Sequence, residues 1–100
     1  MDSRLPIDAD TLERVCQRHQ IRKLSLFGSR LKGTARPDSD IDLLVEFDPS
    51  AHPTLLDMAE IEIELSELMG GVRVDLRTPQ DLSRYFRDEV VGEAKVQYAV

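Results

Sequence analysis

Apolar residues recur along the chain at two spacings, and each spacing predicts one kind of element. After Pro6, the spacing i, i+3, i+4, i+7 that is typical of an amphipathic helix is shown by Leu12, Val15, Cys16 and His19. Asp8 or Asp10 can cap this helix at its start. Residues 22–27 and 40–47 instead alternate apolar and polar side chains, which is the period of a half-buried β-strand.

The second half of the chain continues this alternation of helices and strands. Residues 54–69 predict the longest helix, and Gly70-Gly71 would terminate it. Its expected buried face consists of Leu55, Met58, Ile61, Leu65 and Leu68. A third strand should place Val72, Val74 and Leu76 inward. A short helix near residues 80–92 and a brief strand at 96–100 are expected to follow it. The pattern predicts an α/β (α+β) fold, a small mixed β-sheet with helices packed on one face.

Two apolar residues of the predicted 54–69 helix leave an alternative open. Leu56 and Ile63 lie seven residues apart and partly off the expected buried face. They either widen the buried stripe or form an apolar seam for a partner. The wider buried stripe is the commoner arrangement, and we favour it on the sequence alone.

Length and charge restrict the possible functions. With 100 residues, we expect residues 1–100 to form one domain without a separate substrate-binding domain. The net charge of −6 and the pI near 4.8 argue against a large nucleic-acid footprint, which would need a basic surface. One cysteine, no long apolar run and an N-terminus without a signal-peptide core predict a cytoplasmic protein.

The strand predicted at residues 40–47 carries two carboxylates on one side. Strand parity places Asp40 and Asp42 on the face opposite Ile41 and Leu43, about 7 Å apart at their Cα atoms. Asp75 holds the equivalent position on the third strand, so the three carboxylates converge if the two strands are adjacent. Clustered carboxylates repel one another unless a cation lies among them, and hard oxygen ligands suit Mg²⁺. The sequence therefore predicts a divalent metal site with one ion or two.

A phosphate-binding turn precedes this acidic strand. Gly28 allows close backbone approach, and the Ser29 hydroxyl and the following amides can donate to phosphate oxygens. Metal and turn together describe a site for a nucleoside triphosphate. Two other motifs fail: the EF-hand would need Gly at Leu43, and the P-loop would need Lys at Thr34.

The stretch Gly28-Ser29, ten residues, Asp40-x-Asp42, with a later Asp75, resembles the signature of the DNA polymerase β nucleotidyltransferase superfamily. More closely, FGSRLKGTARPDSDIDLLVEF with RVDLRTP resembles the minimal nucleotidyltransferases, the MntA-like antitoxins. The resemblance covers nearly the whole chain. It implies a nucleotidyltransferase core and an enzyme that transfers AMP from ATP to a tyrosine of a HEPN-family ribonuclease toxin, which it thereby neutralises. Toxin and antitoxin would form a hetero-oligomer, with no nucleic acid bound directly and no membrane.

The resemblance also assigns roles to residues. Asp40 and Asp42 would coordinate Mg²⁺, with two ions expected, and Asp75 would complete the catalytic metal site and assist activation of the acceptor hydroxyl. Gly28 and Ser29 would hold the triphosphate of the nucleotide. For Arg30, which follows them, two interpretations stay open: it binds the nucleotide phosphates, or it is an exposed arginine beside the turn. Arg77 stands where many relatives carry an apolar residue. Two other functions stay open: an antitoxin that silences its toxin by contact alone, and a nucleotidyltransferase acting on a small molecule.

Overall fold

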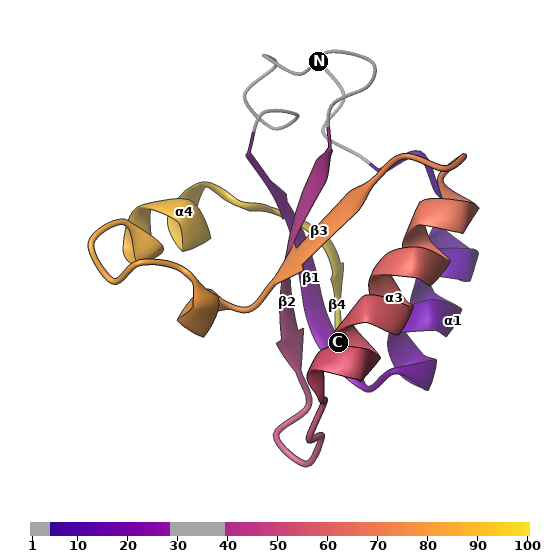
Figure 1. The fold of residues 1–100 in the computed structure, drawn as a ribbon, viewed down its shortest axis with the longest axis horizontal. Coiled ribbons are helices and arrows are strands. Elements are labelled where there is room, and N and C mark those ends of the chain that lie inside the picture. Colours follow the sequence, from indigo (N-terminus) through magenta and orange to yellow (C-terminus); the bar gives the residue numbers. More distant parts are fainter. Residues whose placement is uncertain (1–4, 29–39) are drawn as a thin grey trace.

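The fold is built on one four-stranded sheet, which a computed structural model describes for residues 5–28 and 40–100 (Figure 1). The strands are β1 (Ile21–Phe27), β2 (Ile41–Phe47), β3 (Val74–Arg77) and β4 (Lys95–Ala99). They lie in the order β3-β2-β1-β4. β1 pairs antiparallel with both β2 and β4, whereas β2 and β3 are parallel. The predicted mixed sheet is therefore confirmed.

Two helices cover one face of this sheet, and side chains cap both at their N-termini. In Figure 1, α1 (Ala9–Arg18) and α3 (Leu55–Leu68) lie side by side on that face. Asp8 accepts a hydrogen bond from the backbone N–H of Thr11 at the start of α1. Thr54 and Asp57 form a reciprocal capping box at the start of α3. Such caps satisfy backbone donors that have no partner inside the helix, so these residues set where the helices begin.

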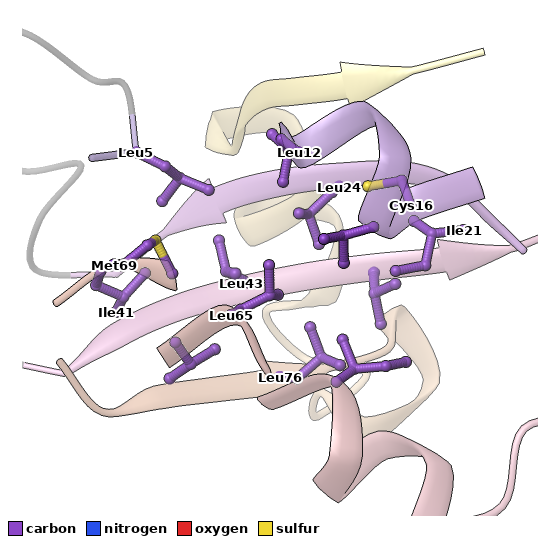
Figure 2. Close-up of a cluster of buried hydrophobic side chains, with 14 of the residues drawn as sticks. Leu5, Leu12, Cys16, Ile21, Leu24, Ile41, Leu43, Leu65, Met69 and Leu76 are labelled. Carbon is purple, nitrogen blue, oxygen red and sulfur yellow. The ribbon is translucent and has the colours of Figure 1, made fainter. Parts of the chain in front are cut away.

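The main hydrophobic core lies between these helices and the sheet (Figure 2). Leu24 and Leu43 from the central strands and Leu65 from α3 are fully buried within it. Cys16 of α1 is also fully buried, and burial raises the pKa of its thiol to about 12. The thiol therefore contributes to packing and stays protonated at neutral pH.

The C-terminal helix is shorter than the sequence predicts. Residues 80–92 do not form one helix, because a 3₁₀ turn, η1 (Pro79–Asp81), comes first and α4 (Arg87–Glu93) begins only six residues after it. The Arg87 side chain donates hydrogen bonds to the backbone carbonyls of Pro79 and Leu82 and so stabilises the turn between them. In Figure 1, α4 lies on the opposite side of the sheet from α1 and α3.

Part of this second face is also buried. Leu44 and Ser25, which point away from the main core by strand parity, are 3% and 4% exposed. They occupy opposite positions on β2 and β1, and Leu82, which follows η1, is buried as well. A small second core therefore forms on the face that strand parity marks as polar.

The expected buried face of α3 is partly wrong. Ile61 and Leu65 are buried, but Leu55 is 89% exposed and Leu68 is 42% exposed. Leu56 and Ile63 are also exposed, so they do not widen the buried stripe as we favoured. The helix is apolar around most of its circumference, and periodicity alone does not select the side that packs on the sheet.

Candidate functional site

The sheet brings two of the predicted site residues together. In the parallel pairing of β2 with β3, Asp42 lies directly opposite Asp75. A backbone hydrogen bond of 2.8 Å from the N–H of Ile41 to the carbonyl oxygen of Arg73 fixes the start of this pairing. Asp40 precedes β2 on the same side of the chain as Asp42, because alternate side chains of an extended chain share a face. The two acidic strands are therefore adjacent, which is the condition under which the carboxylates converge.

Gly28 closes the site from the neighbouring strand. It follows β1 directly, and the last residue of that strand, Phe27, pairs with Asp42. Its backbone has φ +83°, the left-handed region that favours glycine. A Cβ atom on Gly28 would lie 2.2 Å from the Asp42 Oδ2 atom, far inside any allowed contact. The absence of a side chain at Gly28 thus provides the space that the Asp42 carboxylate occupies.

Two arginines of the β3 segment face the carboxylates. The Arg77 guanidinium donates to Asp75 Oδ2 at 3.2 and 3.3 Å, and the Arg73 Nε atom lies 3.9 Å from Asp40 Oδ2. Three carboxylates therefore face two guanidinium groups, which leaves one negative charge uncompensated among these five side chains. All of these arginine and aspartate side chains except Asp42 are more than a third exposed, so water screens their ion pairs strongly.

The electrostatics single out Asp42. Its burial raises the pKa of its carboxyl above the ordinary value of 3.8, and the negative charges of Asp75 and then Asp40 raise it further. The positive charge of Arg77 opposes them. A carboxylate whose charged form is disfavoured by burial and by neighbouring carboxylates gains from a bound cation, and such groups gather at functional sites.

The metal-binding role of these residues remains a prediction. Within the part of the chain that the structure describes, no three His, Cys, Asp or Glu side chains form a group that could hold a metal ion. The Asp75 carboxylate is turned toward Arg77 instead. The predicted nucleotide-binding residues Ser29 and Arg30 lie outside the described residues.

Sequence reasoning missed the pairing of Arg73 with Asp40. The signal was present in the strand RVDLR, where Arg73, Asp75 and Arg77 alternate on one side. Once β2 and β3 are in register, this row of charges lies beside Asp40, Asp42 and Leu44. Periodicity identified the row but not the register, so it did not pair positive with negative residues.

Comparison with known proteins identifies the class to which this fold and site belong. The family model for the nucleotidyltransferase domain matches residues 9–96, so the chain belongs to that family. The predicted enzyme class, nucleotidyltransferase, is thereby confirmed. Among its relatives, the protein adenylyltransferase MntA of Thermococcus cleftensis is 43% identical over 77 residues, which span 77% of this chain and 75% of the relative. The resemblance to minimal, MntA-like nucleotidyltransferases is also confirmed.

Solved structures show the same fold. A toxin-antitoxin structure with AMP-PNP superposes with a TM-score of 0.72 at 21% identity and covers 94% of this chain and 75% of that one. A structure of a tri-AMPylated HEPN toxin from Shewanella oneidensis in complex with an MNT antitoxin gives a TM-score of 0.63 at 18% identity, covering 92% of this chain and 70% of that one. At these identities, the likeness shows the fold alone.

Among residues 5–28 and 40–100, no helix is both long and apolar enough to cross a membrane.

Proposed function

We propose that this protein is an Mg²⁺-dependent protein adenylyltransferase that transfers AMP from ATP to a tyrosine of a HEPN-family toxin and so acts as its antitoxin. The observation that carries the proposal is the pairing of Asp42 with Asp75, closed by Gly28, in a chain of the nucleotidyltransferase family. The name of the Thermococcus relative and the AMPylated toxin bound to an MNT antitoxin support the substrate and the partner. AMP-PNP in a structure of the same fold supports ATP as the donor.

The carboxylates fit the metal that this reaction uses. Asp40, Asp42 and Asp75 offer hard oxygen donors, and Arg73 and Arg77 compensate their charge only in part. Burial and the neighbouring carboxylates disfavour the charged form of Asp42. These three residues would hold Mg²⁺, with two ions expected. When bound, the metal neutralises charge on the attacking and leaving oxygens.

The chain's own residues orient the reactants. Gly28 lets the backbone approach the triphosphate closely beside Asp42, and Ser29 and Arg30 would donate to its phosphate oxygens. The tyrosine oxygen attacks the α-phosphorus, the bond from that phosphorus to the bridging oxygen breaks, and pyrophosphate leaves. Asp75 would assist the loss of the tyrosine proton. Positioning of the two oxygens in line provides much of the rate enhancement.

Intact-mass spectrometry tests the proposal directly. A candidate HEPN-family toxin is incubated with ATP, Mg²⁺ and this protein, in parallel with the Asp40→Asn/Asp42→Asn variant. A gain of one AMP or a small multiple with the unaltered protein alone would establish transfer and place it at the paired aspartates. If the HEPN protein stays unmodified after incubation with folded protein that binds it, the proposed AMP transfer to this partner is refuted.

Inhibition of the toxin by contact alone is the second candidate function. The ion pairs that Arg73 and Arg77 form with the carboxylates favour it. Arg77 occupies Asp75 and Arg73 lies near Asp40, so the carboxylates are partly engaged within the chain itself. An antitoxin of this kind would silence the ribonuclease with no mass change and with the double asparagine variant equally effective. A ribonuclease assay on the same samples separates the two functions. The single cysteine, Cys16, supports a cytoplasmic location for either function.

A further inference from the structure

The outward face of α3 is apolar in a helix whose opposite side forms the core. Leu56 is 69% exposed and Ile63 is 60% exposed. Successive residues of an α-helix are rotated by about 100°, so Leu65, which is fully buried, lies about 180° from Leu56. These two side chains therefore project away from the sheet and contribute nothing to the core.

The pattern on this face is a heptad. Leu56 and Ile63 take the first apolar position, a, of two successive repeats. Ala59 and Ser66 take the other seam position, d, and their small side chains allow another helix to approach closely. Glu60 and Glu67 flank the seam at position e, where charge selects the partner helix in coiled coils. We call these six residues the α3 outer face: Leu56, Ala59, Glu60, Ile63, Ser66 and Glu67.

The neighbouring surface favours a helix over an added strand. A hollow of about 400 Å³ between α3 and β3 is lined in part by Ile63, Ser66 and Glu67. β3 is an edge strand, but Glu62 of α3 accepts the backbone N–H of Leu76 at 2.7 Å. Because this donor is already satisfied, the edge is poorly suited to pairing with a strand of a partner.

Charge selects the kind of helix. Asp57 caps α3, and Glu64 pairs with Arg18 and His19. Glu60 and Glu67 form no ion pair with any residue that the structure describes. A second copy of α3 docked antiparallel would place these glutamates against one another, which like-charge repulsion disfavours. A helix with basic residues beside its apolar stripe would instead be complementary.

We propose that the α3 outer face is the docking surface for a helix of the protein partner that carries apolar residues at heptad spacing, flanked by Lys or Arg. The inference rests on the proposed function, since it takes the HEPN toxin as that partner. It places recognition on a helix that contributes no carboxylate to the proposed metal site, so docking and nucleotide chemistry are separable by mutation.

Binding is measured by isothermal titration calorimetry of a candidate HEPN-family toxin with this protein. Leu56→Glu/Ile63→Glu is compared with Tyr85→Glu/Val91→Glu, which introduces the same charges at exposed apolar positions outside α3. We expect a tenfold or greater loss of affinity for the first variant and less than a twofold change for the second. Glu60→Lys/Glu67→Lys should also weaken binding, by more than Glu60→Gln/Glu67→Gln. Thermal melts followed by circular dichroism establish that each variant is folded.

The outcomes separate docking from catalysis. Three results would overturn the inference. The first is an unchanged affinity in both Leu56→Glu/Ile63→Glu and Glu60→Lys/Glu67→Lys. The others are an equal loss of affinity in the Tyr85→Glu/Val91→Glu control and no binding by the unaltered protein. Asp40→Asn/Asp42→Asn should bind like the unaltered protein and transfer no AMP. If α3 variants lose binding while the unaltered protein binds but transfers no AMP, the docking surface stands and the proposed enzymatic function fails.

Discussion

Replacement of Gly28 by alanine tests the close packing at the site, because two separate costs are expected there. The first is conformational: at φ +83°, a Cβ atom disfavours the backbone by about 1–2 kcal/mol. The second is a collision, since the new Cβ would lie 2.2 Å from Oδ2, 3.0 Å from Cγ and 3.1 Å from Cβ of Asp42. Rotation of the carboxylate relieves only part of this overlap, because the root of the side chain is also close. Such overpacking costs about 1–3 kcal/mol.

The chain contains a matched control for the first cost. Gly70 has φ +82°, and a Cβ there would meet no heavy atom within 4 Å. Gly70→Ala should therefore reduce the free energy of unfolding by about 1–2 kcal/mol, and Gly28→Ala by about 2–5 kcal/mol. Urea denaturation followed by circular dichroism gives both values. The difference between the two variants measures the collision with Asp42.

A double variant isolates the contact. Asp42→Ala removes Cγ and Oδ2 and leaves only the contact with Cβ at 3.1 Å, so Gly28→Ala should cost clearly less in this background than in the unaltered protein. The two substitutions are then non-additive, as expected for residues in contact. Equal destabilisation by Gly28→Ala and Gly70→Ala, or strict additivity with Asp42→Ala, would contradict the packing of Gly28 against the carboxylate.

Three further predictions concern charge and capping. The pKa of Asp42 is raised in the folded state, so ionisation of its carboxyl lowers stability as the pH rises from the ordinary value of 3.8 through the folded pKa. Asp42→Asn should therefore have a higher melting temperature than the unaltered protein at pH 7 and lose that advantage below pH 3.8. An equal difference in melting temperature at both pH values would contradict the raised pKa. Arg77→Met frees Asp75 and should raise the pKa of Asp42 further, which carboxyl NMR titration measures. Mg²⁺ should raise the melting temperature of the Arg77→Met variant more than that of the Arg84→Met variant. Equal rises in melting temperature would exclude competition between Arg77 and the metal. Thr54→Ala should cost about 1 kcal/mol in urea denaturation and Thr54→Ser much less, whereas equal losses would exclude the cap.

The acidic part of the site was predictable because strand parity is a local property. Alternation in DIDLL and VDL places each aspartate opposite an apolar residue, whatever the rest of the fold does. The contact of Gly28 with Asp42 was not predictable in the same way. It depends on the antiparallel register that sets Phe27 opposite Asp42, and register is determined by the whole sheet.

The helical parts show the converse limit. The predicted start of the helix at residue 54 lies within one residue of the start of α3 at Leu55, where Thr54 and Asp57 form a cap within one turn. Which side of α3 packs inward was not given by its sequence, because Leu55, Leu56, Ile63 and Leu68 are apolar but exposed. The break before α4 likewise depends on Arg87 reaching back to the carbonyls of Pro79 and Leu82. Sequence periodicity carries no information about such a contact.

The paired carboxylates and the α3 outer face are two separate places at which a ligand would stabilise the folded chain. Asp42 is held as an anion where burial and its neighbours disfavour the charge, and Leu56 and Ile63 remain in water. The charge on Asp42 lowers the stability of the isolated chain, whereas Leu56 and Ile63 are exposed in the folded and the unfolded chain alike and would be buried only by a partner. A ligand that binds the folded chain alone stabilises it by RT ln(1 + L/Kd), where L is the free ligand concentration, so at a given concentration a tighter ligand stabilises it more. If Mg²⁺ with ATP occupies the first place and the toxin helix the second, the two ligands should raise the melting temperature independently. Asp42→Asn would then remove only the nucleotide effect, and Leu56→Glu/Ile63→Glu only the toxin effect.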